Sequence, residues 1–205
     1  MVVGDEMKEK FLNSTMSFLK KYKNYSKDDI EKLEYGLEGI YLTLTKLVVI
    51  FLLAFLLNIV PELIVVLIFF NIIRFTGFGF HAQKSYQCLI FSIIWFLFVP
   101  LFFLKFQLPK FIYILICLLC VFSYLLFAPA DTVKRPLLNS KKRKIRKIIT
   151  VSIGVVYSTI GIIYFNTWTS KLLISVLLIQ SIIVNPLTYK IFKQPYNNYK
   201  TYKFD

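Results

Sequence analysis

One polar stretch between two apolar segments brings together the residue types needed for covalent catalysis. His81 is the only histidine in the 205-residue chain, and Cys88 follows seven residues later. A cysteine thiol becomes a nucleophile when a neighbouring base removes its proton, and histidine is the usual base. Ser85 can begin a helix that holds Cys88 in its first turn, where the helix N-terminus stabilises a thiolate. Arg74 and Lys84 add positive charge, so the stretch suits acyl transfer through a cysteine.

The spacing of His81 and Cys88 places a demand on the backbone. Seven residues on one continuous helix are two turns, a rise of about 10.5 Å, which is too long for a hydrogen bond between the two side chains. The helix must therefore break between them, and Gly77 and Gly79 can supply unusual backbone angles just before His81. From the residues alone, a polar turn with an incidental cysteine is the alternative to a catalytic dyad.

Other hydrolytic and metal-dependent sites lack their residues. A zinc site of the His-Glu-x-x-His kind needs two histidines. Paired-carboxylate catalysis needs two neighbouring acids, and among the apolar stretches only Asp131 is available near the cytoplasmic side. Neither a Gly-x-Ser-x-Gly elbow nor a P-loop occurs in the sequence. Cys117 and Cys120 lie within an apolar run, which favours packing. We therefore expect no metal ion and no cofactor.

The segments that carry these residues are apolar enough to cross a membrane. The chain is 57% hydrophobic and has a mean hydropathy of +0.65. A spanning helix needs about 20 mostly apolar residues. Six stretches come close to this length: 41–59, 63–80, 89–104, 111–127, 148–165 and 172–192. The pattern predicts one all-α domain, a polytopic membrane helix bundle. The second stretch is strongly apolar only to Ile73, so a re-entrant element is the alternative there.

The positive charge predicts the orientation of the bundle. The net charge is +14, and lysine and arginine gather before residue 41, between the fourth and fifth stretches, and after the sixth. By the positive-inside rule both termini and the polar stretch lie on the cytoplasmic side. The basic loop that contains Lys141, Lys142 and Arg143 is expected to fix this topology, with binding of anionic lipid or an acidic peptide as the alternative. The long apolar stretches indicate a membrane partner and no nucleic acid.

The first 40 residues have the pattern of an amphipathic helix. Met7, Phe11 and Phe18 recur at helical spacing among lysines. Such a helix lies on the inner membrane surface or packs against the bundle. Ser26 and Asp29 have the spacing of a capping box for the helix that leads into the first span. Residues 41–192 would then form the bundle, and residues 193–205 a cytoplasmic tail.

The two polar motifs resemble those of the accessory gene regulator B (AgrB) family, membrane peptidases that mature quorum-sensing peptides. The likeness rests on Arg74, on the Gly-Phe-His-Ala run at 79–82 and on Cys88. A second matching run is Ala-Pro-Ala-Asp-Thr at 128–132, and the length, the number of spans and the basic loop also agree. The family usually has a glycine pair before x-His, and Phe78 stands at the first of those places here.

The resemblance implies a cysteine endopeptidase that acts on an AgrD-like precursor peptide. His81 would take the proton from Cys88, the thiolate would attack the carbonyl at the C-terminal end of the future signal, and the precursor's tail would leave. A side chain of the peptide would then attack the Cys88 thioester and close a thiolactone or lactone ring. The resemblance also implies a homodimer.

Further residues of the motifs are expected to bind substrate or to support the dyad. Gln87 and the backbone N–H of Cys88 can donate hydrogen bonds to an oxyanion. Asp131 can orient His81 or cap a helix. The supporting residues are Arg74, Gly79, Gln83, Lys84, Ser85, Gln87, Asp131, Lys141, Lys142 and Arg143.

A peptide exporter or a channel-like protein without covalent chemistry is the alternative function. Six spans within 205 residues suit a small transporter. Transporters place polar residues along a path through the bilayer midplane. Here the ionisable residues lie at the ends of the apolar stretches, and this distribution favours the peptidase.

Overall fold

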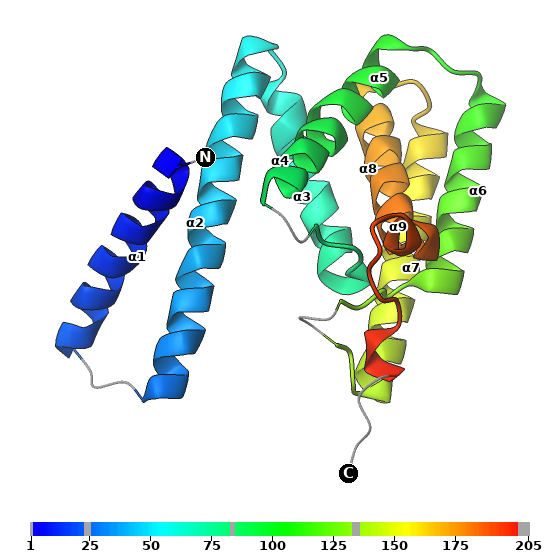
Figure 1. Ribbon diagram of the computed structural model, residues 1–205. Helices are drawn as coiled ribbons and strands as arrows, with labels where there is room; N and C mark the ends of the chain where they lie inside the picture. Colours follow the sequence, from blue (N-terminus) through cyan, green and yellow to red (C-terminus); the bar gives the residue numbers. More distant parts are fainter. Residues whose placement is uncertain (1, 23–25, 83–84, 133–135, 201–205) are drawn as a thin grey trace. The chain divides into compact units, whose positions relative to one another are not determined.

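The computed structural model describes residues 2–22, 26–82, 85–132 and 136–200. The predicted all-α class is confirmed, and Figure 1 shows the helices in chain order. They are α1 (Val2–Tyr22), α2 (Lys27–Leu56), α3 (Val60–Gly77), α4 (Ser85–Ile93), the π-helical η1 (Ile94–Phe98), α5 (Val99–Lys105), α6 (Lys110–Phe127), α7 (Ser140–Ile163), α8 (Trp168–Val184), α9 (Pro186–Ile191) and the 3-10 turn η2 (Asn198–Lys200). The chain divides into two compact units, Met1–Leu53 and Ala54–Asp205.

In the first unit α1 lies alongside α2. Lys8 Nζ forms an ion pair with Glu38 Oε1 at 3.0 Å, and the rings of Phe11 and Tyr41 stack with centroids 5.3 Å apart. The capping box is confirmed at the start of α2, where Ser26 Oγ accepts from the backbone N–H of Asp29 at 3.2 Å and donates to its carboxylate at 2.8 Å. The amphipathic α1 therefore packs on its own unit, and its contact with the membrane surface stays a prediction.

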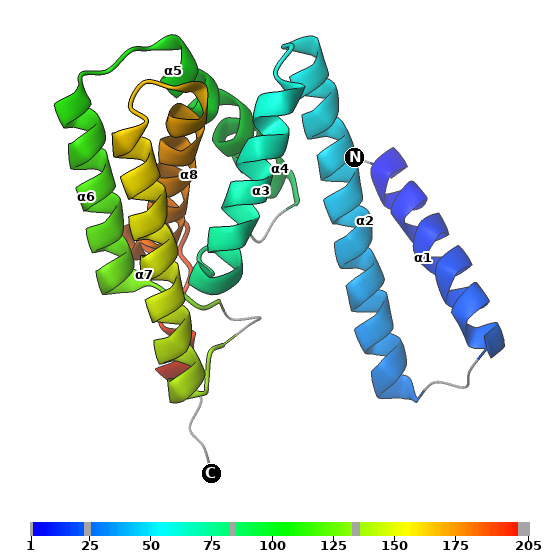
Figure 2. The same ribbon diagram turned by 180° about the vertical axis from the view of Figure 1, so that it is seen from behind.

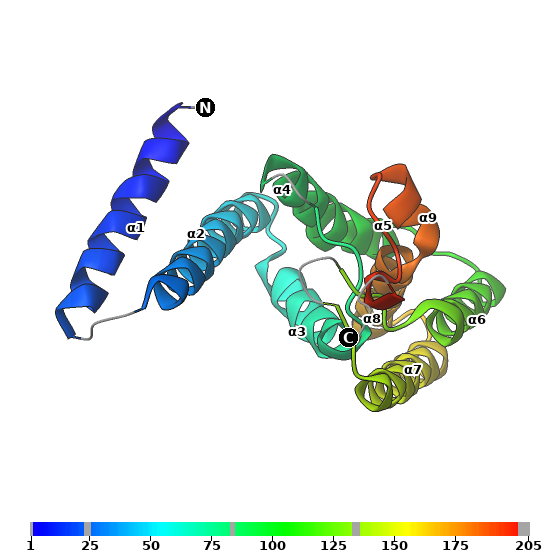
Figure 3. The same cartoon turned by 60° about the horizontal axis from the view of Figure 1, so that its bottom comes forward.

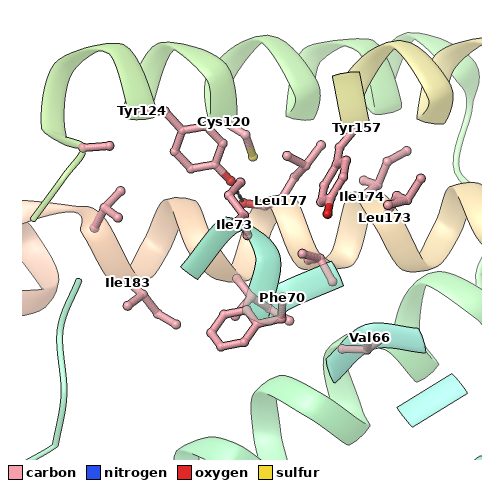
Figure 4. Packing of buried hydrophobic residues seen from close by; sticks show 14 of the residues in the cluster. Val66, Phe70, Ile73, Cys120, Tyr124, Tyr157, Leu173, Ile174, Leu177 and Ile183 are labelled. Carbon is pink, nitrogen blue, oxygen red and sulfur yellow. Dashed lines mark hydrogen bonds between the residues drawn. The ribbon is translucent and has the colours of Figure 1, made fainter. Parts of the chain in front are cut away.

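In the second unit α8 is the central helix. Thirteen of its 17 residues are buried, and α3, α5, α6 and α7 stand around it (Figure 3). A helix that is apolar on all sides belongs inside a bundle. Figure 4 shows Tyr124 of α6, Tyr157 of α7 and Phe70 of α3 packed around the leucines and isoleucines of α8. The buried Tyr124 hydroxyl donates to the carbonyl of Leu177 at 2.5 Å.

Within the part of the chain that the structure describes, five helices are long and apolar enough to cross a membrane, which makes this chain a multi-pass membrane protein. They are Asp29–Leu56, Val60–Gly77, Tyr86–Lys105, Lys110–Phe127 and Ser140–Ile163. The predicted sixth span, 172–192, is wrong as a single helix, because α8 ends at Val184 and α9 starts at Pro186. Asn185 accepts from the N–H of Leu187 at 2.9 Å and Pro186 has no N–H to donate, so a new helix starts here.

Two other predicted boundaries need correction. The basic segment before the fifth span is not a loop, because α7 begins at Ser140 and Asn139 caps it by accepting from the N–H of Lys142 at 3.0 Å. The second span ends at Gly77 and does not continue to Phe80. With 18 residues α3 is about 27 Å long, at the short end of the range found for spanning helices.

Candidate functional site

The link between α3 and α4 is held by main-chain hydrogen bonds to two distant segments. Phe78 forms a single parallel bridge with Ala130, in which the Gly79 N–H donates to Ala130 O at 2.7 Å and the Ala130 N–H donates to Gly77 O at 3.1 Å. The N–H of Phe80 donates to Ile183 O at the end of α8, at 2.9 Å. The link therefore has a defined path into His81, and the helical break that the dyad requires is present.

Arg74 fixes the same link from inside. Its guanidinium donates to the carbonyls of Phe78, Gly79 and Phe80, the last two at 3.1 and 2.7 Å. A guanidinium presents five N–H donors in a rigid fork, which suits three neighbouring carbonyls better than a lysine would. These bonds fix the backbone that leads from α3 into His81.

Two residues that the sequence interpretation missed also hold the link. Gln180, fully buried on α8, donates from Nε2 to Phe78 O at 2.9 Å. Arg146 of α7 donates to Phe75 O at 2.9 Å, and its guanidinium lies 4.5 Å from the centroid of the Phe78 ring. A lone glutamine within an apolar segment is a functional hypothesis by default in membrane proteins, so Gln180 was detectable from sequence. Arg146 was hidden because its segment was taken for a loop.

His81 has a defined ring orientation on an exposed position. Its Nδ1 lies 2.9 Å from the carbonyl oxygen of Ala82. Because a carbonyl can only accept, Nδ1 carries the proton and the neutral ring has its lone pair on Nε2. The backbone carbonyl of His81 accepts from Gln194 Nε2 at 3.1 Å. The ring therefore presents Nε2 as its base.

Cys88 lies in the first turn of α4, as predicted, because the helix begins at Ser85. Its side chain is half-buried, as is that of Gln87. Gln83, Lys84 and the side chain of Ser85 lie outside the described residues, so their predicted supporting roles stay predictions.

Asp131 holds the C-terminal segment. Its buried carboxylate accepts from the backbone N–H groups of Asn198 and Tyr199, both at 2.9 Å, and from that of Leu137 at 3.2 Å. Its own carbonyl accepts from the Tyr189 hydroxyl at 3.0 Å. Burial raises the pKa of this hydroxyl above its usual value, with the charge of Arg74 opposing, so it remains a donor. Of the two roles considered for Asp131, the geometry favours the local structural one.

The basic start of α7 lies beside the site. The first turns of α7 extend beyond the ends of α3 and α6 (Figure 2). A cavity of about 480 Å³ lies here, lined by Arg143, Lys144 and Lys147 together with Tyr196 and Tyr199. Lys141 and Lys142, predicted with Arg143 to bind substrate, are exposed and do not line it. Helical spacing explains the difference, since residues three or four apart share a helix face.

The residues gathered here can perform acyl transfer through a thiolate. A histidine whose Nδ1 is directed at a backbone carbonyl precedes a helix whose first turn carries a half-buried cysteine, and an arginine fixes the backbone between α3 and the histidine. Among the residues that the structure describes, no three His, Cys, Asp or Glu side chains are grouped closely enough to hold a metal ion.

Comparison with known proteins places the chain in a family. The model of the family Accessory gene regulator B matches residues 12–184. Putative AgrB-like proteins of Clostridium acetobutylicum and Listeria innocua are each 29% identical, over 91% of this chain and 90% of the first relative, and over 86% and 88% for the second. One from Clostridium beijerinckii is 31% identical over 86% of this chain and 89% of its own length. No solved structure matches. With a family match that extends from α1 to the end of α8 and includes both polar motifs, this chain belongs to the AgrB family.

Proposed function

We propose that this chain is a cysteine endopeptidase that cuts an AgrD-like precursor through a thioester on Cys88. AgrB proteins process the precursors of autoinducing peptides, and the proposal assigns the chemistry to named residues. It rests on one observation above others. His81 lies on a link held by main-chain hydrogen bonds, its Nδ1 is directed at the Ala82 carbonyl, and the next helix carries Cys88 in its first turn.

The first step is proton transfer from Cys88 to His81. Nε2 accepts the thiol proton, and the resulting imidazolium keeps Nδ1–H on the Ala82 carbonyl. This backbone carbonyl does the orienting work that a carboxylate does in other cysteine and serine enzymes. The carboxylate of Asp131 is occupied by backbone N–H groups, so it is not assigned this role.

The thiolate then attacks the precursor carbonyl at the end of the future signal. The carbon–nitrogen bond breaks, the leaving amine takes the proton from the His81 imidazolium, and the signal remains as a thioester on Cys88. Because α4 begins at Ser85, the N–H groups of its first three residues have no acceptor within the helix. The N–H and side chain of Gln87 are therefore the better oxyanion donors, and the N–H of Cys88 is the weaker one.

A nucleophile within the peptide completes the reaction. A cysteine or serine side chain of the precursor gives its proton to the neutral His81 and attacks the thioester carbonyl, which forms the ring. The carbon–sulfur bond to Cys88 breaks, and the Cys88 thiolate takes the proton from the His81 imidazolium. Water competes at this step, and a site at the membrane boundary limits its access.

The basic end of the bundle orients the enzyme. Arg143, Lys144 and Lys147 lie at the same end as the dyad segment, and by the positive-inside rule this supports an active site on the cytoplasmic side of the membrane. We assign the tail of the precursor to this end and anionic lipid headgroups to the surrounding membrane surface. The homodimer implied by the resemblance stays a prediction.

Mass spectrometry of a synthetic AgrD-like peptide, incubated with the reconstituted chain, tests the proposal. Wild type should release the C-terminal tail and form a thioester adduct at Cys88, whereas Cys88→Ala and His81→Ala should do neither. The matched control is Cys117→Ala/Cys120→Ala, which removes the two buried cysteines of α6 and leaves Cys88 as the sole thiol. Equal cleavage by wild type and Cys88→Ala would overturn the mechanism.

A measurement without precursor avoids dependence on the peptide chosen. In the variant with Cys88 as its sole thiol, iodoacetamide should alkylate Cys88 faster at pH 7 when His81 is present than after His81→Ala, by about tenfold or more, because the thiolate is the reactive form. Equal alkylation rates would show that His81 does not activate Cys88.

A further inference from the structure

The chain that follows α9 returns to the dyad segment and makes contacts along its length. We call residues 192–200 the C-terminal strap. Figure 1 shows it running back from α9 along the end of the second unit that carries the basic start of α7. Phe192 packs on Phe80 and Phe91, with ring centroids 4.7 and 5.0 Å apart. The strap lies beyond the part of the chain that the family model matches, which ends at residue 184.

One contact of the strap is made at His81 itself. Gln194 Nε2 donates to the His81 carbonyl at 3.1 Å, while its own backbone N–H donates to Tyr189 O at 2.8 Å. The second bond fixes the glutamine backbone on α9. The hydrogen bonds of Arg74 and Gln180 hold the link only as far as Phe80. Gln194 thus extends the support by one residue, to the backbone that carries the imidazole.

The far end of the strap is anchored at a buried site. Asp131 and Asn198 are 2% and 3% exposed, and the Asp131 carboxylate accepts the N–H groups of Asn198 and Tyr199. Arg143 stacks over the Tyr199 ring at 3.7 Å, and the Tyr196 hydroxyl donates to Phe127 O at 3.2 Å. Gln194 lies between two fixed parts of the strap, Phe192 and the anchor at Asn198, so its side chain loses little entropy when it forms one more hydrogen bond. The strap can therefore hold Gln194 in place against the backbone of His81.

We propose that the C-terminal strap is part of the active site and that Gln194 is a positioning residue for His81. The amide N–H of Gln194 fixes the His81 carbonyl, and this fixes the peptide between His81 and Ala82. The carbonyl of that next residue is the acceptor for Nδ1–H, so Gln194 acts on the ring orientation through the backbone. The assignment of a catalytic task to His81 rests on the proposed function, whereas the effect of Gln194 on the imidazole does not.

Four variants of the full chain, reconstituted in phosphatidylglycerol-containing vesicles, test the proposal kinetically. Gln194→Ala should lower kcat for peptide cleavage about tenfold with KM nearly unchanged, the effect of one lost positioning hydrogen bond. Gln194→Glu keeps the shape but loses the donor, so it should lose at least as much. Gln194→Lys restores a donor and should recover part of the rate. Lys190→Ala, an exposed change on α9, should behave as wild type.

Nuclear magnetic resonance of the single histidine gives a readout that does not depend on the peptide. With 15N-histidine labelling and a histidine-free tag, wild type should show a predominantly Nδ1-protonated imidazole, because the Ala82 carbonyl accepts that proton. Gln194→Ala should move the nitrogen shifts toward a mixture of tautomers, while its melting temperature stays within about 2 °C of wild type.

The outcomes separate the two proposals. Unchanged nitrogen shifts and unchanged kcat in Gln194→Ala, with Cys88→Ala inactive, would overturn the positioning role and leave the peptidase mechanism standing. Shifted nitrogen signals together with full cleavage by Cys88→Ala would support the strap and overturn the mechanism. A rise in KM at constant kcat would show that Gln194 binds the substrate peptide, and this would contradict a positioning role.

Discussion

Gly79→Ala should abolish peptide cleavage because glycine alone fits the backbone at this position. Gly79 has φ +118°, a conformation that costs an L-amino acid about 1–3 kcal/mol. An added Cβ would lie 2.6 Å from Arg74 Nη1, 2.7 Å from Ile183 Cγ2 and 2.9 Å from Ile183 O. The last contact is with backbone, so relief requires the link to move away from α8.

The size of the effect follows from the bonds that this movement breaks. Separation from Ile183 loses the hydrogen bond from the Phe80 N–H, worth about 1 kcal/mol, and displacement of Arg74 loses a charge-assisted bond worth about 2 kcal/mol. Together with the backbone strain the native path of the link is destabilised by about 4–6 kcal/mol. Since 1.4 kcal/mol is a factor of ten, we expect a loss of cleavage of at least about 1,000-fold.

The assay is the initial rate of tail release by reconstituted protein, with Gly36→Ala and Gly39→Ala as matched controls. These two glycines lie within α2, and a Cβ at either meets nothing within 4 Å. Both controls should keep the wild-type rate, because alanine in a helix interior is favoured over glycine by about 1 kcal/mol. Gly79→Ala with more than about a third of the wild-type rate would refute the claim that this link must follow its observed path.

Three further substitutions test other parts of the site and its support. Arg74→Lys should lower kcat about 10- to 100-fold in the same assay, because one ammonium cannot reach three carbonyls. A wild-type rate would show that only the positive charge at this position matters, and not the three hydrogen bonds. Asp131→Asn should lower the free energy of unfolding by about 2–3 kcal/mol and expose the C-terminal strap to trypsin, since an amide NH₂ would face backbone N–H donors; unchanged cleavage kinetics by trypsin would contradict the anchor. Gly154→Ala places a Cβ 2.7 Å from the buried Tyr124 ring and should destabilise by about 1–3 kcal/mol in thermal melts, with a normal rate where the protein is folded.

The apolar segments and the helical break were predictable because each depends on local sequence, whereas the dyad stays a prediction. Hydrophobic length indicates spans, and two turns of helix are too long for contact between His81 and Cys88. The boundary at Asn185 was also readable, since an Asn-Pro pair is a common helix start, but the apolar run on both sides of it concealed the signal. The helical start of α7 is hard to recognise in sequence, because its six basic residues resemble a loop when the cap at Asn139 is not considered.

Apart from Arg74 and Gln180, the support of the dyad segment was not predictable, because it comes from residues about 50 to 115 positions away in sequence. Ala130, Ile183 and Gln194 bond to the link with backbone groups or a common amide, and neither type leaves a pattern in sequence. Asp131 was recognisable from its motif. Its role could not be predicted, because it depends on the C-terminal tail, for which the sequence predicts no secondary structure. Only the packing of α8 at the centre brings these segments together.

Phe78 shows how this arrangement replaces a missing glycine. The family pattern has glycine at this place, and the structure holds Phe78 at φ +52°, which is unfavourable for a bulky residue. Three contacts stabilise Phe78 in this conformation. Its carbonyl accepts from both Arg74 and Gln180, and its ring lies against the guanidinium of Arg146. Glycine at this position would need no such contacts to adopt the angle. The long-range bonds that position His81 therefore also hold Phe78 in its strained conformation, which explains why the dyad segment keeps its path despite the departure from the family pattern.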